Sequence, residues 1–253
     1  MYLKTRGLVL RVSPYNDSDA MLTILTGEQG RISAKVRGLR RKNSPLAASC
    51  QLLAYAEFTL FDYKGVYTVN EAQSITLFTD LRKDLQKLSL GTYFAQVGEV
   101  VSQEDAPTSE FLSLLLNCLY VLSKLDFSED QIKAVFELRS ACLAGYTPNL
   151  SGCQVCGDPN CTYMDISGGR LQCGRCGVFG QGGIRMPLTP GMLDAMRYIC
   201  YCEPGRLFSF TLPNEAMGQL SAITESYLSA QLERGFSALD FYKSLLYQSD
   251  SVF

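Results

Sequence analysis

The chain of 253 residues contains no histidine and no tryptophan. Without histidine there is no Ser-His-Asp or Cys-His catalytic machinery, no HExxH metalloprotease and no histidine that acts as a general base. The phosphate loop of ATP-driven motors, Gly-x-x-x-x-Gly-Lys-Ser/Thr, is also missing. No apolar run approaches the roughly 18 residues of a membrane span, and the N-terminus lacks the basic start and apolar segment of a secretion signal. We therefore expect a protein that is neither secreted nor embedded in a membrane.

Charge is unevenly distributed along the chain. Residues 1–80 carry ten basic and seven acidic side chains, a net charge of +3, whereas residues 81–253 carry thirteen basic and eighteen acidic ones, a net charge of −5. This division indicates a surface for a polyanion in the first third and a basic protein partner for the remainder. Chance variation in composition is the alternative. With 47% apolar residues the chain has the material for a sizeable core.

Residues 1–80 have the pattern of β-structure. Short apolar runs are separated by turn signals such as Ser13–Asp17, Thr26–Gly30 and Asp62–Gly65. The runs are Gly7–Val12, Met21–Leu25, Arg31–Val36, Leu52–Phe61 and Val66–Phe78. Five short strands at this spacing predict a small barrel or sandwich. Tyrosines in this part can stack on bases, although packing within the sheet is their more common role: Tyr2, Tyr15, Tyr55, Tyr63 and Tyr67.

The third of these runs has a basic face. In residues 31–37 the apolar Ile32, Ala34 and Val36 alternate with polar and basic side chains, so one face enters the core and the other is cationic. Six positive charges lie within residues 31–42, with no acidic residue among them: Arg31, Lys35, Arg37, Arg40, Arg41 and Lys42. A basic face that continues into a loop can follow a phosphate backbone without reading bases. We predict these six residues as a nucleic-acid-binding site, with an ordinary solvated loop as the alternative.

The pattern changes to helix at about residue 79. Ser128 with Gln131 predicts a capping box at the start of one helix, and Gly145 predicts its end. Thr189 followed by proline has the pattern of an N-cap and the first helical position. Further helical stretches are 111–125, 214–234 and 236–247.

A segment at about 150–186 differs from the helical sequence on either side. It is rich in glycine and cysteine and has few large apolar residues, so it cannot fold on hydrophobic burial alone. We therefore expect an N-terminal domain over residues 1–80 and a helical domain over residues 81–253, with 150–186 as an insertion.

Four cysteines of this insertion have the spacing of a zinc site. Two C-x2-C pairs are separated by sixteen residues: Cys153, Cys156, Cys173 and Cys176. Gly157 and Gly177 follow the pairs, where a positive φ lets backbone amides turn toward the sulfurs. Four thiolates close the shell of the metal, so the pattern predicts a structural rather than a catalytic zinc ion. A disulfide set and a redox or iron–sulfur role are the alternatives; Cys161 is either a spare thiol or a ligand in place of one of the four.

The order of these parts is specific: a barrel with a basic third strand, then helices, then a four-cysteine site within the helical part. Three blocks add detail: Gly7–Leu10 with Asp17–Asp19, Leu22–Thr26 and Gly30–Ile32; Val36–Arg41 with Ser44; and Phe136–Pro148 leading into Cys153. In these blocks and in this order, nearly the whole chain resembles the RecO family of bacterial recombination mediators. The sequence departs from the family pattern at Asn16, near which the family tends to have a glutamate, and in the additional Cys161.

The resemblance implies a fold, a function and partners. The fold is α+β, with an N-terminal oligonucleotide-binding (OB) β-barrel followed by an α-helical domain that carries a zinc-binding insertion. The function is that of a mediator in DNA repair, which binds single- and double-stranded DNA, anneals complementary strands and helps load recombinase onto protein-coated single strands. The partners are RecR, single-stranded DNA-binding protein and the RecA recombinase, in the bacterial cytoplasm and nucleoid.

Two other functions compete with this one. A zinc-dependent deaminase needs an open metal position and a glutamate beside a ligand, but no glutamate lies between residues 138 and 202. A nuclease needs clustered carboxylates around a hard metal, which the basic part does not offer. We therefore expect no enzymatic activity. An RNA-binding or ribosome-associated OB-fold scaffold with structural zinc stays open, because sequence does not tell whether such a groove prefers DNA or RNA.

Overall fold

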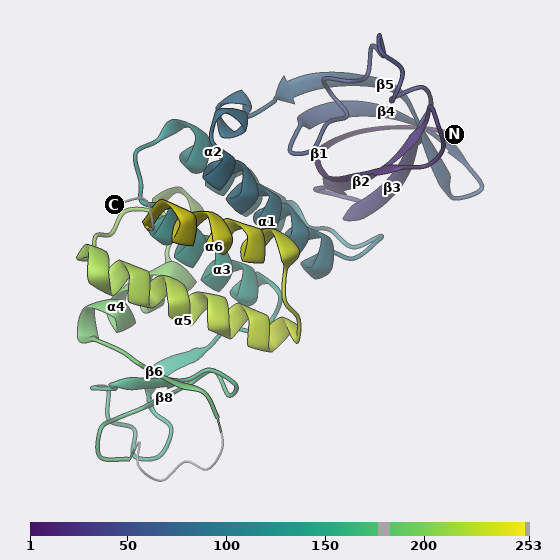
Figure 1. Cartoon of the computed structure of the whole chain (residues 1–253). Coiled ribbons are helices and arrows are strands. Elements are labelled where there is room, and N and C mark those ends of the chain that lie inside the picture. Colours follow the sequence, from purple (N-terminus) through teal and green to yellow (C-terminus); the bar gives the residue numbers. More distant parts are fainter. Residues whose placement is uncertain (177–182, 251–253) are drawn as a thin grey trace. The chain divides into compact units, whose positions relative to one another are not determined.

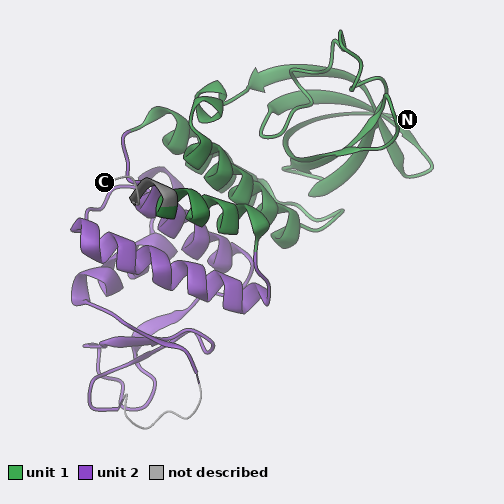
Figure 2. Cartoon of the chain, in the orientation of Figure 1, with its two compact units in different colours: residues 1–125, 236–253 green, residues 126–235 purple. Residues whose placement is uncertain are grey.

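The structure is a computed structural model that describes residues 1–176 and 183–250. The chain forms two compact units, coloured separately in Figure 2: residues 1–125 with 236–253, and residues 126–235. The predicted domain boundary at residue 80 follows the change from strands to helices rather than this division, and it stays a prediction.

The first unit begins with a closed five-stranded β-barrel (Figure 1). Its strands are β1 (Tyr2–Pro14), β2 (Ala20–Thr26), β3 (Arg31–Val36), β4 (Tyr55–Tyr63) and β5 (Val66–Thr76). They follow one another around the barrel in the order β1-β2-β3-β5-β4, and β4 closes it by pairing with β1. Within the barrel, β3 and β5 pair in parallel and the other neighbours pair antiparallel. The predicted OB-type barrel is confirmed, and the sandwich alternative is wrong.

The barrel core consists of alternate residues of its strands. Ile32, Ala34 and Val36 of β3 are buried in it together with residues such as Phe58 and Leu60 of β4. The residues between them face outward, so the alternation predicted for the third run is confirmed. One face of β3 therefore contributes to stability, while the other is free to carry charge.

Three helices and a short 3-10 turn complete the first unit: η1 (Thr79–Lys83), α1 (Leu85–Val101), α2 (Ser109–Lys124) and α6 (Ser237–Asp250). Asp84 caps α1, because its carboxylate accepts hydrogen bonds from the amides of Gln86 and Lys87. α1 contacts β1 and also α2 and α6. The ring of Phe236, just before α6, lies 5.3 Å from the ring of Tyr93 in α1, centroid to centroid. The C-terminal helix thus belongs to the unit that begins with the barrel.

The second unit combines helices with a small sheet. The helices are α3 (Glu129–Leu143), α4 (Pro190–Tyr201) and α5 (Asn214–Leu232), with the 3-10 turn η2 (Pro204–Arg206). The four-stranded sheet has the order β6-β8-β7-β9, formed by β6 (Asn149–Cys153), β7 (Tyr163–Asp165), β8 (Arg170–Gln172) and β9 (Arg185–Pro187). With these elements the predicted fold class is confirmed.

The predicted helix boundaries in the second unit are also confirmed, but only the Ser128 half of the capping box forms, because the Gln131 side chain donates to the carbonyl of Phe210 at 3.0 Å. The Ser128 hydroxyl accepts a hydrogen bond from the Gln131 amide at 3.2 Å, at the start of α3. Gly145 follows the end of α3 with φ of +90°. The Thr189 hydroxyl accepts from the Met192 amide at 3.3 Å and begins α4. In the described part of the chain, none of the helices is long and apolar enough to span a bilayer.

A buried charge cluster joins α3 to α5. Lys133 is 3% exposed, and its Nζ lies 3.1 Å from an oxygen of Glu137, which is fully buried, and 2.8 Å from Glu225. The same ammonium donates to the carbonyl and the hydroxyl of Ser221 at 3.2 and 3.3 Å. The Thr224 hydroxyl donates to Glu137 at 2.7 Å. Buried charges in this cluster are therefore both paired and hydrogen-bonded.

Candidate metal centre and nucleic-acid interface

Four thiols meet beside the small sheet. Cys153 is the last residue of β6, and Cys173 directly follows β8, the strand that pairs with β6. A tight turn after each of these residues places the second cysteine of the pair, Cys156 or Cys176, beside the first. In the first turn the Gly157 amide donates to the carbonyl of Cys153 at 2.8 Å, and in the second the Cys176 amide donates to the carbonyl of Cys173 at 3.2 Å.

The four sulfurs have the spacing of a metal shell. Those of Cys153, Cys156, Cys173 and Cys176 all lie within 4.8 Å of one another. The sulfurs of Cys156 and Cys173 are 3.7 Å apart. A tetrahedral zinc with bonds of about 2.3 Å separates its ligand sulfurs by about 3.8 Å. The predicted grouping of these four cysteines is confirmed, and the residues fit a metal ion held by thiolates.

Backbone amides favour the charged form of two of these sulfurs. Amides of Cys173, Cys156 and Val155 lower the pKa of the Cys153 thiol to about 6. The amide of Cys176 lowers the pKa of Cys173. Gly157 has the predicted positive φ, +75°, in the first turn; Gly177, predicted to act alike, lies outside the described residues. Because thiolates are the metal-binding form, this backbone prepares the site for a cation.

Cys161 is not a member of the group. Its thiol is buried and donates to the carbonyl of Asp158 at 3.2 Å. Burial raises the pKa of this thiol to about 11. Cys161 therefore lies outside the cluster of four sulfurs, and its role as a spare thiol stays a prediction. The ten cysteines are all free thiols in the structure.

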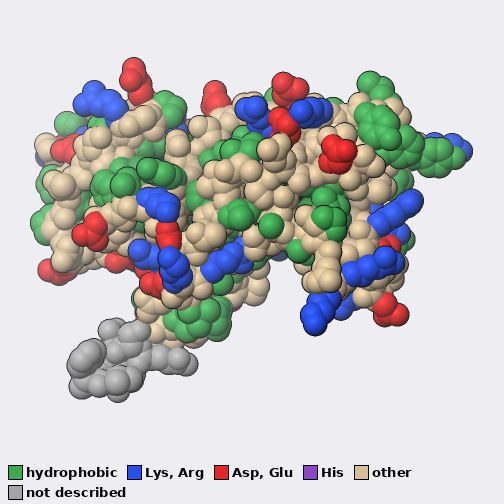
Figure 3. Space-filling model, turned by 90° about the horizontal axis from the view of Figure 1, so that it is seen from above, with side chains coloured by type: hydrophobic (Ala, Val, Ile, Leu, Met, Phe, Trp, Pro, Cys, Tyr) green, Lys and Arg blue, Asp and Glu red, His purple; other side chains and the backbone are tan. Residues whose placement is uncertain are grey.

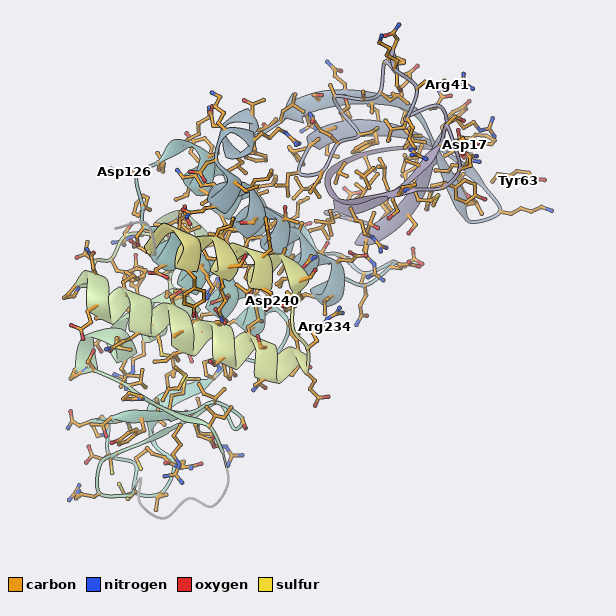
Figure 4. All side chains as sticks on the ribbon, viewed as in Figure 1. Asp17, Arg41, Tyr63, Asp126, Arg234 and Asp240 are labelled. Atoms are coloured by element: carbon orange, nitrogen blue, oxygen red, sulfur yellow. The ribbon has the colours of Figure 1, made fainter. Side chains whose placement is uncertain are left out.

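The predicted basic site lies mainly at one end of the barrel. The loop after β1, the loop after β3 and the hairpin between β4 and β5 meet there, because Ala20 pairs with both Pro14 and Val36, and Lys35 pairs with Thr68 near the start of β5. Figure 4 shows Asp17 and Arg41 of the two loops, and Tyr63 at the end of β4, at this end of the barrel. Loops in these positions form the ligand surface of OB-folds.

Asp19 joins two of these loops. Its carboxylate accepts from the Gly38 amide at 2.9 Å and pairs with Lys35 Nζ at 3.1 Å. The Gly38 amide, followed by the Lys35 ammonium, holds the pKa of Asp19 well below its usual range. In the other direction, Arg40 donates from its amide to the carbonyl of Ser18 at 3.0 Å and from its guanidinium to the carbonyl of Asn16 at 2.7 Å. The basic loop therefore has a fixed shape.

The six predicted basic residues do not form one patch. Arg37, Arg41 and Lys42 are exposed at the loop end, and Figure 3 shows Lys and Arg side chains gathered over the barrel at the right of the view. Lys35 is half-buried, paired with Asp19 and 4.4 Å from the ring centre of Tyr15.

Arg31 begins β3 at the opposite end of the strand, six residues and roughly 20 Å from Arg37. Its guanidinium donates to the carbonyl of Glu99 in α1. The nucleic-acid role of all six residues stays a prediction.

Two family models match the chain, one over each part. Recombination protein O N terminal matches residues 1–78, and Recombination protein O C terminal matches residues 82–240. The chain belongs to the RecO family.

Curated RecO proteins are similar over almost the full length. DNA repair protein RecO of Acetivibrio thermocellus is 36% identical over 246 residues, which cover 96% of this chain and 97% of the relative. RecO of Alkaliphilus metalliredigens is 28% identical over 248 residues, 97% of this chain and 100% of the relative. RecO of Bacillus subtilis is 25% identical over 228 residues, 90% and 88% of the two chains.

The hairpin after β4 in this RecO-family chain was considered in the sequence only through Tyr63, as a candidate stacking residue, and Lys64 was not predicted. Lys64 and Gly65 both have positive φ, +53° and +81°, in the tight hairpin between β4 and β5. The ring of Tyr63 is 62% exposed, and Lys64 Nζ lies 5.5 Å from its centre. The sequence Tyr-Lys-Gly between two predicted strands could have indicated that this hairpin contributes to a binding surface, because hairpins at this position border the ligand groove of OB-folds.

Proposed function

We propose that this protein is a recombination mediator in DNA repair, which binds single- and double-stranded DNA and anneals complementary strands. In this role it helps load a recombinase onto protein-coated single strands in the cytoplasm, at the nucleoid. RecR, single-stranded DNA-binding protein and RecA are the proposed partners. The observation that carries the proposal is the closed OB barrel whose loops present exposed cations at one end.

The proposed annealing mechanism is electrostatic. Two strands repel one another through their phosphates, and cations that bind both release condensed counterions and remove that repulsion. Arg37, Arg41 and Lys42 have no acidic neighbour in their own loop, whereas Asp19 partly neutralises Lys35. Tyr15 and Tyr63 are exposed, and their rings offer stacking surfaces to bases. No step in this mechanism forms a covalent bond or needs a nucleotide, so we propose a protein without enzymatic activity.

We propose zinc as the metal of the four-cysteine group. A shell of four thiolates leaves no coordination position for water or substrate, so the ion is structural. The short strands β6, β7 and β8 each have only a few buried apolar residues. Metal binding there supplies folding free energy that burial does not.

Salt dependence of DNA binding tests the proposed surface. For single strands the slope of log affinity against log salt is about −0.7 per phosphate contact, so the double change Arg37→Ala and Arg41→Ala should make it shallower by about 1.4. Affinity should fall alike for all sequences, because phosphate contacts do not distinguish bases. Arg40 is left in place because its guanidinium holds the loop at Asn16.

The matched control is Arg234→Ala, an exposed arginine of the second unit (labelled in Figure 4). It should leave both affinity and slope unchanged. A folded double variant with unaltered slope would place the DNA site elsewhere, and a strict ATP requirement for annealing by the protein alone would contradict the electrostatic mechanism. Tighter binding of RNA than of DNA of equal length would favour the RNA-binding alternative.

A further inference from the structure

A second pair of thiols lies in the second unit, away from the metal ligands in the sequence. Cys142 is in the last turn of α3 and Cys200 in the last turn of α4, and their sulfurs are 3.6 Å apart. A disulfide has its sulfurs about 2.0 Å apart, so the two must approach by roughly 1.6 Å. Neither cysteine belongs to the four-cysteine group.

A cation lies next to this pair. Arg139, one helical turn before Cys142, donates from its guanidinium to the carbonyl of Cys200 and, at 3.3 Å, to that of Ile199. Its position is therefore fixed by α4 and not by an acidic partner. A fixed positive charge beside a thiol favours the thiolate, which is the form that reacts with oxidants.

The two thiols have different roles. In the neutral pair the Cys142 thiol donates to the sulfur of Cys200, and the Cys200 thiol can donate in return once Cys142 is a thiolate. This interaction, together with the hydroxyl of Thr147 and the charge of Arg139, outweighs burial and lowers the pKa of Cys142 to about 7. The same bond raises the pKa of Cys200. Cys142 is half-buried, so a small oxidant has access, whereas Cys200 is only 6% exposed. Cys142 is the first nucleophile, and Cys200 is placed to resolve the product.

We propose that Cys142 and Cys200 form an oxidative modification site, which a hydroperoxide converts to a disulfide between α3 and α4. The Cys142 thiolate attacks one oxygen of the hydroperoxide, the O–O bond breaks, and the leaving alkoxide or hydroxide takes a proton from solvent. The Cys200 sulfur, after losing its proton, attacks Cys142 and displaces hydroxide, which becomes water. Two thiols are oxidised by two electrons, and the hydroperoxide is reduced to an alcohol, or to water, plus one water.

The disulfide would enclose the metal-bearing sheet. The residues between Cys142 and Cys200 include β6, β7, β8 and β9 and all four clustered cysteines. A bond that closes this loop limits the freedom of its unfolded state, which stabilises the folded one. Oxidation should therefore make the second unit harder to unfold without using a metal ligand.

The test is treatment of the metal-loaded full chain with hydrogen peroxide, followed by alkylation of free thiols and peptide mapping without reductant. We expect a linked peptide pair that contains Cys142 and Cys200, at a peroxide dose that releases no metal to a chromogenic chelator. In Cys200→Ser, dimedone should instead label Cys142 as a sulfenic acid. Cys202→Ser, two residues further along, is the matched control and should form the same linked pair.

Three results would overturn the proposal. The first is that Cys142 stays reduced until the peroxide dose is high enough to release the metal. Another is Cys142 linked to Cys202 instead of Cys200. The third is an equal rate of linkage in urea-unfolded protein, since the proposal requires the folded arrangement of α3 and α4.

Discussion

The buried cluster around Lys133 allows a quantitative prediction. Replacing Lys133 by methionine keeps most of the side-chain volume but removes the ammonium that faces Glu137 and Glu225. Glu137 is 0% exposed, so its carboxylate would stay buried after losing this ammonium, while it still accepts from the Thr224 hydroxyl. The change therefore tests how far the free energy of unfolding falls when a buried carboxylate loses its ammonium partner.

The expected cost is large. Breaking a buried ion pair by removing one partner destabilises a protein by about 3–5 kcal/mol. A change of 1 kcal/mol lowers the melting temperature by about 2–4 °C for 150–250 residues. Lys133→Met should therefore lower the melting temperature of the second unit by about 6–20 °C. Adding Glu137→Gln removes the buried negative charge and keeps a hydrogen-bond acceptor for Thr224, so it should recover most of the loss.

Differential scanning calorimetry of the three proteins provides the measurement. The matched control is Lys124→Met, because Lys124 also pairs with a carboxylate, that of Asp80, but is 51% exposed. Exposed pairs contribute about 0–1 kcal/mol, so this control should shift melting by a few degrees at most. If Lys133→Met and Lys124→Met have equal effects, or if Glu137→Gln recovers nothing, the cost does not come from a buried charge.

Three further predictions concern the metal centre, a turn and a loop. Cys153→Ser should release the metal, as seen by elemental analysis, and lower the melting temperature, whereas Cys161→Ser should do neither. Gly30→Ala should destabilise the first unit by about 1 kcal/mol or more in urea unfolding, because φ is +67° and the new Cβ would lie 2.2 Å from a backbone oxygen. Because the pKa of Asp19 is lowered in the folded protein, its bond to Gly38 should persist as the pH falls from 7 to about 4, the unfolded value. The contribution to stability is lost only on further acidification, and an NMR titration of the Gly38 amide would show a shift in that lower range alone.

Sequence patterns predicted elements wherever local chemistry determines the backbone. The bounds of β3 agree with the predicted Arg31–Val36, because an alternation of core and surface residues leaves one register. β1 instead begins at Tyr2 rather than Gly7. The first half of β1 contains the exposed Lys4 and Arg6 and is extended because it pairs with β4. No run of apolar residues in this half predicts that pairing.

The candidate sites were likewise predictable where they depend on local sequence and not where they depend on contacts between distant segments. Cysteine spacing predicted the four-thiol group because both turns are local. Spacing did not show that Arg31 bonds to Glu99 or that Asp19 pairs with Lys35, since both contacts depend on how distant segments meet. The number of cations within residues 31–42 was thus predictable from the sequence, but the number of them that stay free of other contacts was not.

The first unit contains both ends of the chain, and this affects how the protein folds during translation. Leu125 is the last residue of the first unit before the 110 residues of 126–235 are made, and Phe236 is the first to rejoin it. At about 5–20 residues per second, the ribosome takes roughly 5–20 s over that interval. Meanwhile α1 lacks α6, the helix that packs against it. A nascent chain that stalls before Phe236 therefore displays an uncovered apolar helix, the kind of surface that recruits chaperones and proteases, even though its barrel was completed long before.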